Sequence, residues 1–161
     1  DLPEFKHTKN YRCQCEKLQK ILNLCRKAIA MNDSDTYINI REILIKLGFD
    51  IVKKENINYQ VEDLIITKTH KNKDYYTEKY KHLHKYKIEE KTKDYSNGDI
   101  IIGPQPIGVK SVLQHAFTVH SIQGETASTN LFIDINRMDS MRMLYTSLSR
   151  AKYLSQIIII E

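Results

Sequence analysis

Short apolar runs, separated by stretches of helical periodicity, constrain the fold of this chain more than any other feature. Strands that are buried on both faces of a sheet read as continuous apolar runs of a few residues. Such runs stand at 64–67, 100–102, 116–119, 131–133 and 157–160. Apolar residues at helical spacing mark about 14–30, 38–47, 72–86 and 139–150. This alternation predicts an α/β fold in which helices flank a parallel sheet.

Turn and cap residues set the expected boundaries of these elements. Gly48 stands where the helix over 38–47 needs a C-terminal cap. Asn97-Gly98 is a turn signal directly before the apolar run at 100–102. Asp139 can cap the helix that runs to about Arg150. The strand over 116–119 is expected to lead into a turn at Gln123-Gly124.

Length and composition indicate one soluble domain. The chain has 161 residues, of which 41% are hydrophobic and 28% are charged. Its longest purely apolar run, 157–160, is far too short to span a bilayer, so we expect no membrane association. An odd set of three cysteines argues against a disulfide framework and favours a reducing, intracellular compartment. The chain begins at Asp1 rather than Met, so we expect it to be part of a longer protein.

The excess positive charge is concentrated in one segment. Nine lysines stand between Lys68 and Lys93 against four acidic residues, which equals the net charge of +5 for the whole chain. Tyrosines and histidines are interleaved with these lysines. Lysines attract phosphates and aromatic rings stack on bases, so one interpretation is a nucleic-acid surface. The alternative is a solvated, lysine-rich helix.

Two segments near the C-terminus carry the most specific pattern. The first reads Ala-Phe-Thr-Val-His-Ser-Ile-Gln-Gly-Glu-Thr over 116–126 and places hydroxyls, an imidazole and a glycine after a strand. The second reads Leu-Tyr-Thr-Ser-Leu-Ser-Arg-Ala-Lys over 144–152 and delivers an arginine near the end of a helix. Hydroxyls suit phosphate contacts, and a glycine lets the backbone approach a ligand closely.

In order, spacing and residue type, these two segments resemble motifs V and VI of superfamily-1 helicases, specifically the RecD-like branch. Weaker resemblances fall at Asn10-Tyr11-Arg12, at 63–70 and at 95–100. The resemblance spans the chain and implies the RecA-like domain called 2A, a parallel sheet flanked by helices. It also implies a small basic insertion, which we expect within 70–110, because fuller relatives carry an SH3-like module before motif V.

The resemblance implies roles in ATP hydrolysis. The phosphate-loop pattern G-x-x-x-x-G-K-[ST] is absent from the chain. ATP and Mg²⁺ would therefore be held mainly by a separate N-terminal RecA-like domain of the same protein. Arg150 would act as an arginine finger on the γ-phosphate, with Arg12 as a second such arginine. Gln123, Gly124 and Glu125 would lie near the nucleotide.

The resemblance also implies a grip on single-stranded DNA, with 5′ to 3′ polarity. The expected contacts to the DNA backbone are Thr118, His120, Ser121, Thr67 and Thr69. A large DNA virus replication protein, acting at a viral replication site in the host cell, is the expected source. Two departures stand out: many relatives carry Lys where Ser121 stands, and their acidic residue stands where Thr126 is found, which puts Glu125 in doubt.

Two other functions stay open. One is a nucleic-acid-binding module without ATPase activity, supported by the lysine-rich segment. The other is an RNA-directed viral superfamily-1 helicase domain, which shares these motifs. His82 and His84 lack nearby metal-binding partners in the sequence, so we expect no metal site. His115 and Tyr145 are expected to be structural.

Overall fold

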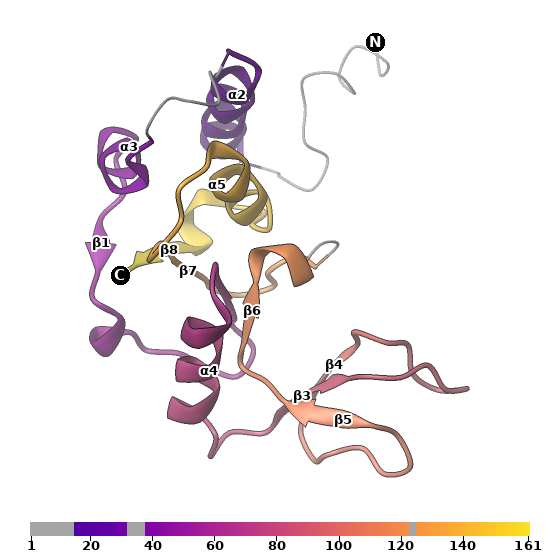
Figure 1. The fold of residues 1–161 in the computed structure, drawn as a ribbon. Coiled ribbons are helices and arrows are strands. Elements are labelled where there is room, and N and C mark those ends of the chain that lie inside the picture. The colour runs from indigo at the N-terminus through magenta and orange to yellow at the C-terminus, as the bar shows by residue number, and fades with distance from the viewer. Residues whose placement is uncertain (1–14, 32–37, 123–124) are drawn as a thin grey trace.

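Five parallel strands form the main sheet, and helices lie on both of its faces (Figure 1). This computed structural model describes residues 15–31, 38–122 and 125–161. Across the sheet the strands follow the order β1, β8, β7, β2, β6, and every neighbouring pair is parallel. Their bounds are Ile51–Val52 for β1, Leu64–Thr67 for β2, Ala116–Thr118 for β6, Leu131–Asp134 for β7 and Ile157–Ile160 for β8. The parallel α/β architecture predicted from the apolar runs is confirmed.

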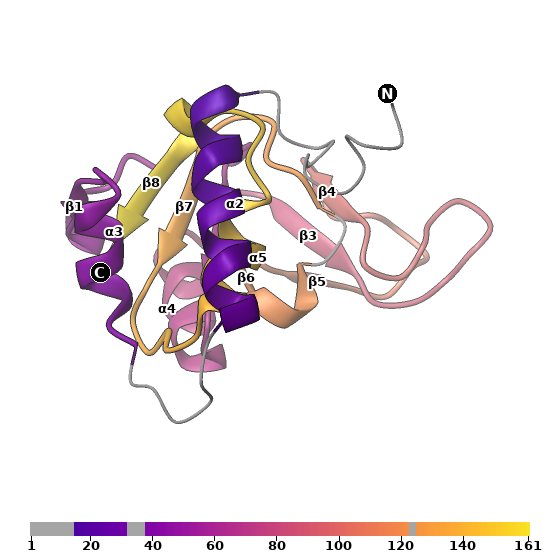
Figure 2. The ribbon, with the colours of Figure 1, turned by 90° about the horizontal axis from the view of Figure 1, so that it is seen from above.

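The helices divide between the two faces of this sheet. They are α2 (Glu16–Met31), α3 (Ile40–Lys46), α4 (His70–Lys79) and α5 (Met141–Leu148). Strand β2 shows the division: Leu64 and Ile66 belong to the core shared with α2, α3 and α5, whereas Ile65 belongs to a smaller core shared with α4. Helix α2 runs along its face beside α5 (Figure 2). Single 3-10 turns follow β1, follow β6 and precede β8: η1 (Lys54–Asn56), η2 (Val119–Ser121) and η3 (Leu154–Gln156).

Local sequence explains the two N-terminal helices. Along α2 the buried residues are spaced at i, i+3, i+4 and i+7, which places Leu18, Ile21, Leu22 and Cys25 in the core. Helix α3 ends in a Schellman motif, because the amide of Gly48 donates to the Ile45 carbonyl and that of Phe49 donates to the Leu44 carbonyl, both at 3.0 Å. Gly48 has φ of 94°, which this motif requires. The predicted cap is confirmed.

Two predicted elements differ from the structure. The helix expected over 72–86 ends at Lys79, and the residues after it form a loop and then a strand. The reason is visible in 85–88, where Lys, Tyr, Lys and Ile alternate with the period of two that suits a strand. The last helix begins one residue later than expected, because the hydroxyl of Ser140, and not Asp139, accepts the amide of Met143 at 3.1 Å.

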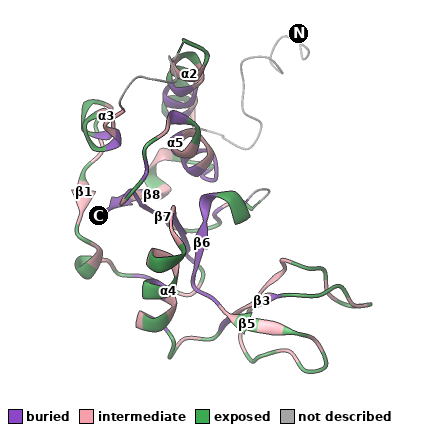
Figure 3. Ribbon diagram, viewed as in Figure 1, coloured by how far each residue is buried: buried purple, intermediate pink, exposed green. Residues whose placement is uncertain are grey.

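A second, antiparallel sheet projects from the end of the main sheet beyond β6 (Figure 1). Its order is β4-β3-β5, with bounds Ile100–Ile102 for β4, Lys85–Ile88 for β3 and Ser111–Leu113 for β5. The strand predicted at 100–102 exists, but it belongs to this small sheet. Buried residues are concentrated in the main sheet, and the small sheet is mostly half-buried or exposed (Figure 3). Within 70–110, where an insertion was expected, α4 belongs to the main layer because it contacts β2 and β6.

A buried polar chain joins the two sheets. The ammonium of Lys85 donates to the carbonyl of Asp63 at 2.6 Å and lies 3.4 Å from the hydroxyl of Tyr59. Nε2 of His115 lies 3.1 Å from the carbonyl of Leu83, so it must carry the proton, and Nδ1 accepts the Tyr59 hydroxyl at 2.9 Å. Burial lowers the pKa of Lys85 to about 8 and that of His115 to about 4. His115 is therefore neutral and structural, as the sequence predicted.

Candidate nucleotide and nucleic-acid site

The carboxyl ends of β2 and β6 bring two threonines together from distant parts of the chain. Thr67 and Thr118 are register partners on these neighbouring strands. Thr67 is fully buried, and its hydroxyl donates to the carbonyl of Thr69 at 3.1 Å. Direct contact between Thr67 and DNA is therefore a wrong expectation, because no part of its side chain reaches the surface. It positions the loop that carries Thr69.

The exposed side chains of this edge come from the two loops that follow the strands. His120 and Ser121 in η2 are exposed, whereas Thr118 is nearly buried. The Thr118 hydroxyl donates to the Ser121 hydroxyl at 3.1 Å, and Ser121 donates in turn to the Thr118 carbonyl at 3.1 Å. Thr69 is half-buried and caps α4 by accepting the amide of Asn72 at 3.1 Å. The hydroxyls thus have fixed orientations at this edge.

Arg150 stands directly after the C-terminal cap of α5 and is mostly buried. Its guanidinium donates from Nε to the Thr146 carbonyl at 3.2 Å, from Nη2 to the Ser149 hydroxyl at 3.1 Å, and from Nη1 to the Glu125 carbonyl at 3.4 Å. The Arg150 carbonyl also accepts the amide of Ala127 at 2.8 Å. The two C-terminal sequence motifs are therefore in direct contact through Arg150.

The arginine and the threonine pair occupy different ends of the sheet. Strands β7 and β8 are parallel, so α5 must return the chain from the carboxyl end of β7 to the amino end of β8. Arg150 follows α5 and therefore lies toward the amino end of β8. Thr118 ends β6 at its carboxyl end. Among the described residues, Arg150 and the Thr67–Thr118 pair therefore lie toward opposite ends of the sheet.

Several expected site residues lie outside the described part of the chain. These are Arg12, Gln123 and Gly124. Glu125, the next described residue, is exposed, and its amide donates to the Ile122 carbonyl at 3.2 Å. The structure thus brings Arg150 against the backbone of one expected nucleotide residue.

Gln156 is a further residue at this junction that the sequence did not single out. Its side-chain amide donates to the carbonyls of Ala127 and Thr129 at 3.1 and 2.7 Å. Its side-chain oxygen accepts the backbone amides of Lys152 and Tyr153 at 2.7 and 2.9 Å. One side chain therefore links the loop after Glu125 to the turn after Arg150. A glutamine before an apolar run carries no signal of this role in the sequence.

The lysine-rich segment is not one continuous basic surface. Lys85 is buried, and Tyr76 and Tyr80 belong to the core beneath α4. The side chain of Tyr75 is partly exposed, with the Lys54 ammonium 4.3 Å from its ring centroid. Two of the four tyrosine rings between 68 and 86, those of Tyr76 and Tyr80, therefore pack inside the protein and are unavailable to stack on bases. This weakens the interpretation of the segment as a separate nucleic-acid module.

Two further observations bear on the expected cofactors and partners. Among the described residues, no group of three or more His, Cys, Asp or Glu side chains is arranged to hold a metal ion. Within the same residues, no helix is both long and apolar enough to cross a bilayer.

Comparison with known proteins gives similarity at the level of structure alone. No protein-family model matches the sequence. No curated protein matches it either. Among solved structures, Pif1 helicase from Candida albicans matches with a TM-score of 0.64 at 11% identity, over 95% of this chain and 55% of that one.

Two further solved structures give the same result. Bacteroides Pif1 helicase in complex with ADP-AlF3 and single-stranded DNA matches with a TM-score of 0.58 at 16% identity, over 94% of this chain and 50% of that one. A structure of two coordinating Pif1 helicases, concerned with DNA unwinding at forked double-stranded DNA, gives 0.59 at 17% identity, with 94% and 48% coverage. The chain spans about half the length of these structures. Its fold is the RecA-like α/β fold found within these Pif1 helicases.

Proposed function

We propose that this chain is the C-terminal motor domain of an ATP-dependent DNA helicase. It would act with a second RecA-like domain of the same protein, which supplies the phosphate loop and holds Mg²⁺. The fold likeness to Pif1 helicases and the two C-terminal motifs support this proposal. The RecD-like branch, a viral replication protein and an intracellular location remain part of the same proposal.

The observation that carries the proposal is the contact between Arg150 and Glu125. It joins the segment expected near the nucleotide to the arginine expected to meet the γ-phosphate. The 3.4 Å donation to the Glu125 carbonyl is longer, and hence weaker, than those to the Thr146 carbonyl and the Ser149 hydroxyl. A phosphate oxygen carries more negative charge than a carbonyl and would take this donor in exchange.

In this role Arg150 neutralises charge that develops on the transferring phosphoryl group. A planar guanidinium can donate two parallel hydrogen bonds to phosphate oxygens, which a lysine ammonium cannot reproduce. Gln156 would act as a positioning residue, because it holds both the segment after Glu125 and the turn after Arg150. We assign no Mg²⁺ ligand to the described residues.

The carboxyl ends of β2 and β6 would contact the DNA backbone. The exposed residue His120 and the half-buried Thr69 offer donors to phosphate oxygens, and Ser121 would do so in exchange for its bond to the Thr118 carbonyl. Thr118 would act mainly by orienting Ser121. Arg12, Gln123 and Gly124 retain their proposed roles on the strength of the sequence resemblance.

The experiment that tests this function compares ATP hydrolysis by the 161-residue chain alone with hydrolysis by a protein that also contains a phosphate-loop domain. We expect background turnover from the chain alone, because no loop is present to hold the β- and γ-phosphates, and DNA-stimulated turnover from the two-domain protein. Robust turnover from purified 161-residue chain would overturn the proposed division of labour. A two-domain protein that binds ATP but never hydrolyses it would remove the motor function.

A further inference from the structure

A cavity of about 760 Å³ lies at the carboxyl ends of four parallel strands. It is lined by residues from the segments that follow β1, β2, β7 and β8. Only Thr69 among its lining residues was expected at a site from the sequence. The volume falls within the range of about 300–1,000 Å³ that is usual for ligand pockets.

The sheet topology explains why the cavity forms here. From β2 the chain passes by way of α4 to β6 on one side, whereas from the neighbouring β7 it passes by way of α5 to β8 on the other side. The segments that leave β2 and β7 therefore diverge to opposite faces of the sheet. In open α/β sheets, the crevice outside the carboxyl ends of strands at such a reversal is where ligands bind.

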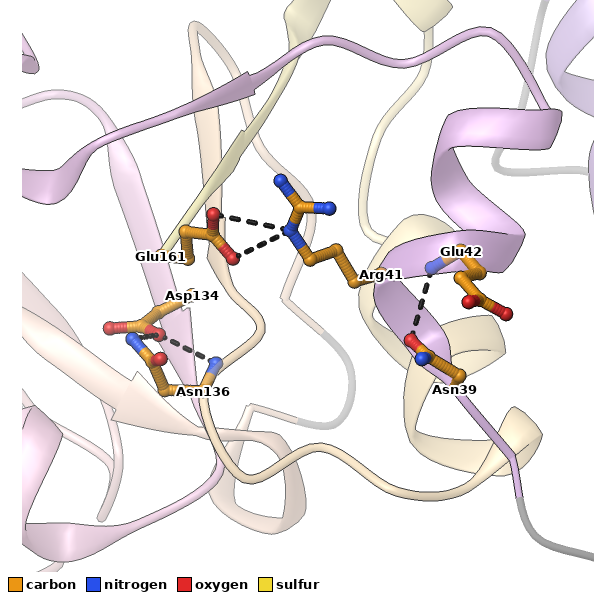
Figure 4. A network of polar contacts seen from close by, with 6 residues as sticks. All are labelled: Asn39, Arg41, Glu42, Asp134, Asn136 and Glu161. Atoms are coloured by element: carbon orange, nitrogen blue, oxygen red, sulfur yellow. Dashed lines mark hydrogen bonds and ion pairs between the residues drawn. The ribbon is translucent and has the colours of Figure 1, made fainter.

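The charge of the lining favours an anion. Four cationic side chains, Lys53, Lys54, Lys71 and Arg137, face two acidic ones, Glu55 and Glu161. The carboxylate of Glu161 is paired with Nε of Arg41 at 3.2 Å, which offsets its charge (Figure 4). Lys53, Lys71 and Arg137 take part in none of the four ion pairs found among the described residues.

The backbone around the cavity is fixed in a way that suits an anion. Among the described residues, Arg137 is the one non-glycine residue with a positive φ, at 68°. This conformation is unfavourable for a residue with a Cβ atom and persists where the surroundings impose it. Here Asp134 holds the turn, because its Oδ1 accepts both the backbone amide and the side-chain amide of Asn136 at 2.9 and 2.8 Å (Figure 4). Helix α4 also begins at the cavity, so its first turn adds partial positive charge.

We propose that this cavity binds a phosphate-bearing ligand, with Lys53, Lys71 and Arg137 as its cationic contacts. The phosphate belongs either to the backbone of a nucleic-acid strand or to a free phosphorylated molecule such as a nucleotide. The inference rests on the proposed function only in naming a nucleic-acid strand as one source. The residues of the ATP-hydrolysis proposal, Arg150 and Glu125, take no part in it.

The test is an NMR titration of the isotope-labelled 161-residue chain with inorganic pyrophosphate. We expect saturable shifts of the backbone amides at Lys54, Lys71, Asn72 and Arg137. Arg137→Gly removes one cation and also relieves the positive φ, so the variant keeps its fold; its affinity should fall about tenfold, the loss expected for one charge-assisted contact. Lys20→Gln, an exposed lysine on α2, removes the same charge elsewhere and should leave the affinity unchanged.

Two further arms identify the source of the phosphate. Displacement of pyrophosphate by a short oligothymidylate without terminal phosphates would assign the site to a DNA strand. Displacement by ADP alone would assign it to a free nucleotide. Shifts that never saturate, or that are equally strong in Arg137→Gly, would overturn the proposal. Absence of ATP hydrolysis in a two-domain protein would refute the motor function and leave these pyrophosphate shifts intact.

Discussion

Tyr59 donates a hydrogen bond of 2.9 Å to Nδ1 of His115, 56 residues away, in the buried polar chain that joins the two sheets. Protonation of His115 would remove this acceptor and place a charge in a buried site. Burial is the main reason that the pKa of His115 falls from 6.5 to about 4, and the cationic Lys85 nearby adds to it.

The first prediction concerns acid stability. The folded-state pKa of His115 lies below that of the unfolded chain, so the unfolded state binds the proton more readily between pH 6.5 and pH 4. The free energy of unfolding should therefore fall as the pH drops through this window. The slope approaches about 1.4 kcal/mol for each unit of pH between the two pKa values. His115→Gln should lose less stability between pH 7 and pH 4.5 than the unmodified protein, measured by urea denaturation. His70→Gln, at an exposed position, is the control, and equal losses in all three proteins would contradict the prediction.

The second prediction concerns the anchor between α4 and the main sheet. The hydroxyl of Tyr76 donates to Oδ2 of Asp134 at 2.7 Å, and both side chains are fully buried. Tyr76→Phe leaves one carboxylate oxygen without this donor and should lower the free energy of unfolding by about 1–3 kcal/mol. Tyr75→Phe removes a hydroxyl from the partly exposed neighbour and should change it little. An equal change in the free energy of unfolding from the two substitutions would show that the hydrogen bond between Tyr76 and Asp134 adds no stability beyond that of an exposed hydroxyl.

The third prediction concerns single-stranded DNA. The 161-residue chain would supply only one of the two domains that contact DNA, so it should bind single strands weakly, with a dissociation constant of about 10⁻⁴ to 10⁻⁶ M. The affinity should fall as the salt concentration is raised. Ser121→Asp places a negative charge at the exposed edge of η2 and should weaken binding further. Ser128→Asp adds the same charge at an exposed position toward the other end of the sheet and serves as the control. Fluorescence anisotropy at two salt concentrations measures both effects. An affinity that does not change with salt, or that is the same in Ser121→Asp and in the unmodified protein, would count against this edge as a DNA contact.

Four of the five strands of the main sheet could be predicted from the sequence, because burial on both faces leaves an unbroken apolar run, whereas β1, with two half-buried residues, was not predicted. Strands β2, β7 and β8 are such runs. In the small sheet only β4 was predicted as a strand: β3 alternates polar and apolar residues and overlaps the expected end of a helix, and β5 has only three residues, none of them buried. β3 is a strand because it pairs with β4 and β5, whose residues lie 12 or more positions away in the sequence.

The site was predictable only as far as its side chains form local motifs. Arg150 stands out in the sequence, but its partners at Thr146 and Glu125 are backbone carbonyls, which leave no trace in residue identity. The cavity beside Arg137 combines four separate loops, and strand order alone brings these together. The hydroxyl of Thr67 suits a phosphate contact, but its burial could not be predicted, because the sequence shows only one polar residue at the end of an apolar run.

The fourth prediction, on Gln156, separates positioning from direct chemistry. Gln156→Ala removes four hydrogen bonds that hold the segments around Ala127 and Tyr153. In a two-domain protein we expect a partial loss of ATP turnover, because Arg150 remains present but is less well oriented. Gln156→Glu keeps the acceptor for the amides of Lys152 and Tyr153 but loses the two donations, so it should fall between the alanine variant and the unmodified protein. Full activity in Gln156→Ala would remove its positioning role.

The most direct test of the central claim is the rate of ATP hydrolysis by Arg150→Ala in a protein that contains both RecA-like domains. The guanidinium also donates to Thr146, Ser149 and Glu125, so the variant will be less stable and turnover must be measured well below its melting temperature. Arg142→Ala, at an exposed position on the same helix, controls for loss of a charge. A finger predicts a fall of about 10³ to 10⁵ in rate with DNA binding retained and no rescue by Arg150→Lys. Near-normal turnover in a merely less stable protein would contradict it, and would leave Arg150 as a cap on the end of α5.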